Sequence, residues 1–147
     1  RFNMDPEFIP TPTAEAWQLS NAPVLNMAVH KVALDLFEEA GMGALRERSL
    51  RLTAYLEQVI QCVAQRTGTD LEILTPNDPA QRGCQLSIVA HGHGRSLFDH
   101  LMAQGVVVDW REPAVIRMAP VPLYNSFEDI ARFGKVLEDG LLAHGQG

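Results

Sequence analysis

The sequence predicts an α+β domain in which helices pack against one face of a small, mostly antiparallel sheet. Apolar residues recur at helical spacing in the first half of the chain and again at its end. Between these regions the pattern changes to short strand-like runs separated by glycine and proline. The predicted order is therefore two helices, two strands, a short helix, two strands and a final helix.

The first two elements are predicted to be helices. A capping side chain followed by proline at the first turn marks a helix start at Ser20-Asn21-Ala22-Pro23, and this helix should run to about Ala40. Gly41 ends it, and a second helix over about 44–66 is ended by Gly68. The apolar face of the first helix comprises Leu25, Ala28, Val29, Val32 and Leu36.

The middle of the chain predicts the sheet. Strands are expected at 71–75, 84–90, 106–110 and 115–119, with a polar loop at 76–83 and a short helix at 96–104. The pattern Ser126-x-x-Asp129 is typical of a helix start and opens a last helix, to about His144. Its expected inner face comprises Phe127, Ile130, Ala131, Gly134, Leu137 and Leu141.

Composition limits the class of protein. The chain has 147 residues, of which 46% are hydrophobic and 20% charged, as in one globular domain with a genuine core. A net charge of −6 disfavours a nucleic-acid partner, because phosphates would be repelled. No apolar run reaches the ~18 to 20 residues that span a bilayer, and no signal peptide is recognisable. We therefore expect a cytoplasmic protein that binds neither nucleic acid nor membrane.

Other candidate sites are weak. Cys62 and Cys84 are isolated and flanked by apolar residues, which predicts small buried side chains in a reducing compartment. His91 and His93 flank a glycine without a nearby set of further ligands, so no metal site is predicted. The first twenty residues lack a sustained period and begin with Arg1 rather than methionine, which favours a segment taken from a longer chain.

Arg117 is the strongest candidate for a binding residue. It lies on a short apolar strand that runs into a proline-stiffened turn, and a planar guanidinium can hold a carboxylate through two parallel hydrogen bonds. Because its neighbours Ile116 and Met118 anchor the strand in a core, the arginine must reach a cleft or an internal acid. Both readings stay open, with Asp109 or Glu112 as the internal partner.

Four segments together resemble the C-terminal portion of kynureninase. They are WQLSNAPV at 17–24, RGCQLS at 82–87, GVVVD at 105–109 and VIRMAPVPLYNSF at 115–127. The resemblance implies the small domain of a pyridoxal-phosphate enzyme with the aspartate aminotransferase fold. Such enzymes cleave L-kynurenine, or its 3-hydroxy form, to anthranilate or 3-hydroxyanthranilate and L-alanine, and work as homodimers with active sites at the subunit interface.

The resemblance also implies roles for two residues. Arg117 corresponds to the arginine that binds the substrate α-carboxylate, and Asn21 to an asparagine near the aromatic end of the substrate. From the residues alone, capping of the helix that begins near Pro23 is the preferred role of Asn21, and the two roles are compatible. The implied domains are an irregular segment at 1–22, from the end of the large domain, and the C-terminal small domain at 23–147.

The chain lacks a suitable cofactor lysine. Its two lysines, Lys31 and Lys135, lie within amphipathic helices, where an exposed side chain is the ordinary outcome. By the resemblance, the lysine and phosphate loops of the family lie upstream, so we predict no bound pyridoxal phosphate and no turnover for this chain by itself. The alternative is a free-standing α+β module that captures an amino acid through Arg117 without the missing large domain.

Overall fold

The computed structural model describes residues 6–18 and 20–144. Its contacts divide the chain into two compact units, Arg1–Glu39 and Ala40–Gly147. The predicted succession of helices and strands is confirmed across the described residues.

The first unit contains a short 3₁₀ helix, η1 (Ala14–Trp17), and most of α1 (Val24–Ala40). The helix bounds agree with the prediction, and the Pro23 carbonyl accepts the first helical hydrogen bond, from the Met27 amide at 3.0 Å. The apolar face of α1 is not buried within this unit, since every described residue of the unit is exposed. The exposed fractions on that face are 83% for Leu25, 74% for Val29, 63% for Val32 and 56% for Leu36.

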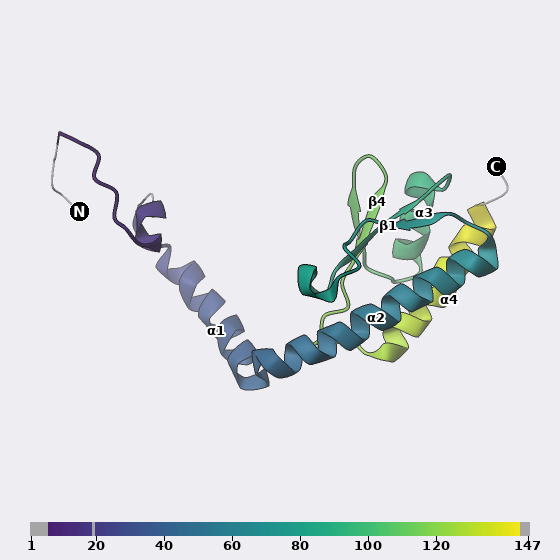
Figure 1. The fold of residues 1–147 in the computed structure, drawn as a ribbon, viewed down its shortest axis with the longest axis horizontal. Coiled ribbons are helices and arrows are strands. Elements are labelled where there is room, and N and C mark those ends of the chain that lie inside the picture. Colours follow the sequence, from purple (N-terminus) through teal and green to yellow (C-terminus); the bar gives the residue numbers. More distant parts are fainter. Residues whose placement is uncertain (1–5, 19, 145–147) are drawn as a thin grey trace. The chain divides into compact units, whose positions relative to one another are not determined.

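In the second unit two long helices pack side by side. These are α2 (Met42–Thr67) and α4 (Phe127–His144), which run along one another in Figure 1. The capping box predicted for α4 is confirmed, since Ser126 Oγ accepts from the Asp129 amide at 3.2 Å and Asp129 Oδ2 from the Ser126 amide at 2.8 Å. The buried residues that the two helices share with the core include Leu52, Leu56, Ile60, Val63, Ile130, Phe133, Leu137 and Leu141.

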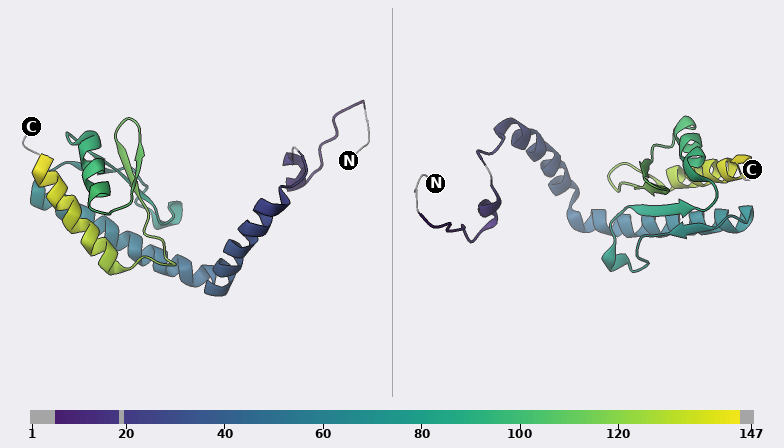
Figure 2. Two further views of the ribbon diagram at one scale, coloured as in Figure 1. Left: turned by 180° about the vertical axis from the view of Figure 1, so that it is seen from behind. Right: turned by 90° about the horizontal axis from the view of Figure 1, so that it is seen from above.

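The sheet has four strands in the order β1-β2-β4-β3, and each neighbouring pair is antiparallel. The strands are β1 (Leu71–Ile73), β2 (Leu86–Ala90), β3 (Asp109–Arg111) and β4 (Val115–Met118), and α3 (Gly94–Ala103) follows β2 (Figures 1 and 2). Alternate residues of one sheet face enter the core with Leu97 and Leu101 of α3. The fully or nearly fully buried strand residues are Leu86, Ile88, Ala90, Ile116 and Met118.

The predicted strand at 106–110 is shifted in the structure. Pairing with β4 covers only Asp109–Arg111, while the Val106 amide bonds to the Leu101 carbonyl at 2.9 Å as the chain leaves α3. Val107 is 86% exposed, so this valine run joins two elements rather than filling a buried strand. The apolar residues have high strand propensity, but the tertiary contacts decide where pairing begins.

Two further expectations are corrected. Phe127 was expected on the inner face of α4 but is 41% exposed, whereas Phe133, which was not expected there, is buried. Cys62 is exposed and Cys84 half-buried, so the expectation of two buried thiols is wrong. Cys62 lies on the outward side of α2, between the inward-facing Ile60 and Val63. In the described part of the chain, no helix combines the length and apolarity needed to cross a bilayer.

Close packing of α4 against α2 requires Gly134. A Cβ atom built there would lie 2.5 Å from Val59 Cγ1, and the β-branched valine cannot rotate away freely. We predict that Gly134→Ala destabilises the protein by about 1 to 3 kcal/mol despite the better helix propensity of alanine, measured as the free energy of urea unfolding.

Gly43→Ala is the matched control, because this helical glycine has no atom within 4 Å of the position where its Cβ would lie. It should be neutral or stabilising by up to about 1 kcal/mol. In the Val59→Ala background, Gly134→Ala should no longer destabilise the protein. The double variant should therefore be more stable than Val59→Ala alone. Equal unfolding free energies for Gly134→Ala and Gly43→Ala would contradict the packing argument.

Candidate functional site

The strand β4 displays Arg117 on the face of the sheet opposite the core. Ile116 and Met118, its neighbours in sequence, are 1% and 6% exposed and point into the core. Successive side chains of a strand alternate between faces, so Arg117 points the other way. Its side chain is 31% exposed. The prediction of a strand anchored by buried neighbours is therefore confirmed.

An acid on the neighbouring strand contacts Arg117. Asp109 of β3 pairs directly with Arg117 in the register, and Asp109 Oδ2 accepts hydrogen bonds from Arg117 Nε at 2.6 Å and from Arg117 Nη2. The hydrogen bond from Arg117 is the main reason that the pKa of Asp109 lies below its usual value of 3.8. Of the two internal acids considered from sequence, Glu112 instead accepts from Trp110 Nε1 at 2.8 Å.

Arg111 is a second arginine on the same face and was not singled out from the sequence. Its Nε donates to Asp109 Oδ2 at 3.0 Å, so one carboxylate oxygen receives hydrogen bonds from two guanidinium groups. The i, i+2 spacing of Asp109 and Arg111 on a strand was a usable signal, because such residues share a face. The predicted strand at 106–110 ended one residue too early to include it.

The turn after β4 is held by its own side chains. Asn125 Oδ1 accepts from the Val121 amide at 2.8 Å, and the Asn125 amide donates to the Val121 carbonyl at 2.9 Å. Arg48 of α2 donates through Nη2 to the Asn125 carbonyl at 3.0 Å, so the turn is tied to a long helix. These contacts fix the end of β4 and thereby the position of Arg117.

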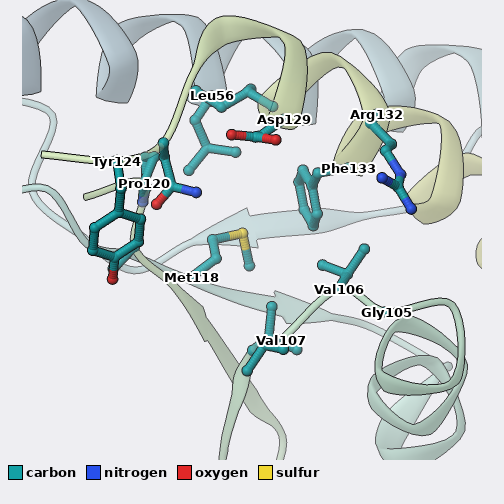
Figure 3. A pocket seen from close by; sticks show the side chains of 14 residues that line it. Leu56, Gly105, Val106, Val107, Met118, Pro120, Tyr124, Asp129, Arg132 and Phe133 are labelled. Carbon is teal, nitrogen blue, oxygen red and sulfur yellow. The ribbon is translucent and has the colours of Figure 1, made fainter. Parts of the chain in front are cut away.

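A pocket of about 400 Å³ lies on the core side of β4. Figure 3 shows Met118, Val106 and Phe133 pointing into it, with Asp129 and Arg132 of α4 above. Arg117 does not line it, because Arg117 lies on the opposite face of the sheet. The pocket is thus not the place where Arg117 would meet a carboxylate.

Asn21, the second predicted binding residue, lies in the first unit and is exposed. Pro23 accepts the first hydrogen bond of α1 and so takes the N-cap position, two residues beyond Asn21. The interpretation of Asn21 as the residue at the N-cap is therefore not supported. A role in substrate binding stays a prediction.

Neither lysine fits a Schiff-base role. Lys31 is 72% exposed and bonds to Asp35 at 2.7 Å, and Lys135 is exposed on α4. A lysine that forms an imine must be desolvated enough to lose its proton near neutrality. Neither Lys31 nor Lys135 is therefore suited to form an imine with pyridoxal phosphate. Of the two histidines near Gly92, His91 contacts an acid: its Nε2 lies 3.0 Å from Glu72 Oε2. Residues 6–18 and 20–144 contain no cluster of three or more side chains suited to bind a metal.

The fold and the site define a class: a small α+β domain that presents an arginine on the open face of its sheet. A family model described as "Kynureninase C-terminal domain" matches residues 45–137. A kynureninase from Christiangramia forsetii is 51% identical over 143 residues, covering 97% of this chain and 34% of that protein. A kynureninase from Xanthomonas oryzae pv. oryzae is 58% identical over 136 residues, covering 90% of this chain and 31% of that protein.

The chain belongs to the kynureninase family, as the resemblance implied. It spans about a third of the length of the curated relatives that it matches. The matched region contains α3 and all four strands, so it contains both Arg117 and the acid that contacts it.

The contacts of Asp109 predict which arginine controls its titration. Arg117→Ala should raise the pKa of Asp109 towards 3.8, and Arg111→Ala should raise it less, because the hydrogen bond from Arg117 is the largest cause of the lowering. The measurement is the pH dependence of the Asp109 carboxyl signal in NMR. A larger shift in Arg111→Ala would contradict this assignment.

The sign of the effect on stability follows. Between the lowered folded pKa and about 3.8, the folded state binds fewer protons at Asp109 than the unfolded state, so stability rises with pH there. The contribution is complete above about pH 3.8 and is lost as pH falls through the folded value. The difference in unfolding free energy between the wild type and Asp109→Ala should therefore shrink only in acid.

Proposed function

We propose that the protein containing this chain is a kynureninase that hydrolyses L-kynurenine to anthranilate and L-alanine, or 3-hydroxykynurenine to 3-hydroxyanthranilate and L-alanine. It would act in tryptophan catabolism, as a hydrolase of a carbon–carbon bond. In this proposal the chain supplies one wall of the substrate site. The observation that carries the proposal is an accessible arginine on the open sheet face of a chain that belongs to the kynureninase family.

Arg117 would bind the α-carboxylate of the substrate. A guanidinium offers two parallel N–H groups that match the two oxygens of a carboxylate, and its side chain is rooted in a strand whose neighbours are buried. Such a contact fixes the orientation of the bound amino acid as well as its affinity. Lysine would hold the charge without the fixed plane.

Asn21 would contact the aromatic end of the substrate. Its amide can both donate to and accept from an aryl ketone or hydroxyl. It is exposed and lies outside the N-cap position of α1, so its side chain is available for a ligand. Support for this role comes from the resemblance around residues 17–24, which makes it a proposal about the whole enzyme.

Pyridoxal phosphate would be held by the part of the enzyme that this chain does not span. The exposure of Lys31 and Lys135 supports that division, and the chain by itself is proposed to be inactive. A large domain, a second copy of the enzyme in a homodimer and a cytoplasmic location complete the proposal.

Substitution of Arg117 tests the proposal. In the full-length enzyme, Arg117→Ala should lower kcat/KM about 30- to 1000-fold, through a raised KM and a lowered kcat. This corresponds to a loss of ~2 to 4 kcal/mol of transition-state stabilisation. Arg117→Lys should recover little, because the paired hydrogen bonds depend on the planar group. Steady-state kinetics with L-kynurenine measure both.

Arg51→Ala is the matched control. Arg51 is also an exposed arginine near an acid, Glu47 at 4.0 Å, but lies on the surface of α2. It should leave kcat/KM within about twofold of the wild type. An unchanged kcat/KM in folded Arg117→Ala would remove the proposed role.

A further inference from the structure

The register of the sheet places an acid beside Arg117 on the outer face. Arg117 is paired with Asp109 of β3 on one side and with Ser87 of β2 on the other. Directly paired residues of antiparallel strands project from the same face and lie close together. Asp109 is therefore placed by the backbone, and its contact with Arg117 does not depend on a flexible loop.

The contact uses one particular edge of the guanidinium. Asp109 Oδ2 accepts from Nε and Nη2 of Arg117, which form the side edge of the planar group. Within residues 6–18 and 20–144, Nη1 of Arg117 makes no hydrogen bond. The end edge, formed by Nη1 and Nη2, is the one that a second carboxylate can meet with two parallel hydrogen bonds.

The charges of the cluster also favour an added anion. Two guanidinium groups, Arg111 and Arg117, share the single carboxylate of Asp109, which leaves one positive charge. The side chains of Arg111, Arg117 and Asp109 are 59%, 31% and 49% exposed, so the cluster is accessible. A carboxylate bound to Arg117 would bring the cluster to neutrality. Glu72, another acid on this face of the sheet, contacts His91 through Oε2.

We propose that Asp109 is a positioning residue for the substrate carboxylate: it holds the side edge of Arg117 so that the end edge is presented to the ligand. The inference rests on the proposed function of Arg117. A half-exposed ion pair contributes little to folding stability, so stability gives no strong reason for this arrangement. A fixed guanidinium, in contrast, loses less conformational freedom when the ligand binds.

Two effects of removing Asp109 have opposite signs, which makes the test sharp. Asp109→Ala raises the net charge of the cluster by one, and electrostatics alone would then strengthen binding of a carboxylate. Loss of orientation would weaken it. If Asp109 positions Arg117, weakening should prevail.

The experiment uses the full-length holoenzyme and two ligands, L-kynurenine and its decarboxylated analogue, the latter assayed as a competitive inhibitor. Asp109→Ala should raise KM for kynurenine roughly ten- to a hundredfold. The inhibition constant of the analogue, which lacks the carboxylate, should change less than twofold. Asp109→Asn, which keeps an acceptor oxygen at the same place, should recover part of the loss. A lowered or unchanged KM in Asp109→Ala, or equal weakening of both ligands, would overturn the proposal.

The double variant separates this inference from the proposed function. Once Arg117→Ala is present, adding Asp109→Ala should not weaken kynurenine binding further, because there is no guanidinium left to orient. If Arg117→Ala alone leaves kynurenine binding intact, the proposed function itself fails. If Arg117→Ala weakens binding and Asp109→Ala does not, only the positioning role fails. Arg51→Ala again serves as the surface control.

Discussion

The register of β4 between β2 and β3 is the constraint on which the candidate site depends. Because side chains alternate across a strand, a slip of one residue would turn Arg117 into the core and expose Ile116 and Met118. Burial of those two apolar side chains opposes such a slip. The same packing energy that folds the domain therefore decides the face on which the guanidinium stands.

The rest of the second unit supports this strand from one side. The helices α2 and α4 cover the core face, and the close approach at Gly134 lets them do so together. Arg48 reaches from α2 to the turn after β4 and holds its carbonyl. Among its described residues, the second unit places no comparable layer on the opposite face, and this asymmetry makes a polar cluster possible on a sheet whose other side is apolar.

Local sequence patterns were sufficient for most elements and failed where packing chose between local alternatives. The capping box at Ser126 and Asp129 correctly opened α4, since it depends on residues three apart. The valine run at 106–108 looked like a strand but takes no part in the pairing with β4, because β3 begins at Asp109. The face of α1 was read correctly as apolar, yet its burial requires a partner surface that helical spacing cannot identify.

The sequence by itself determined the class of fold and the family resemblance, and it made Arg117 a candidate, because periodicity, capping residues and an ordered motif depend on residues close together in the chain. It left open whether Arg117 meets an internal acid or a ligand. Tertiary structure decided that Asp109 is the contacting acid, that it takes only one edge of the guanidinium, and that Arg111 shares it. These facts depend on strand pairing between separate segments, and no spacing along one strand specifies how two strands align.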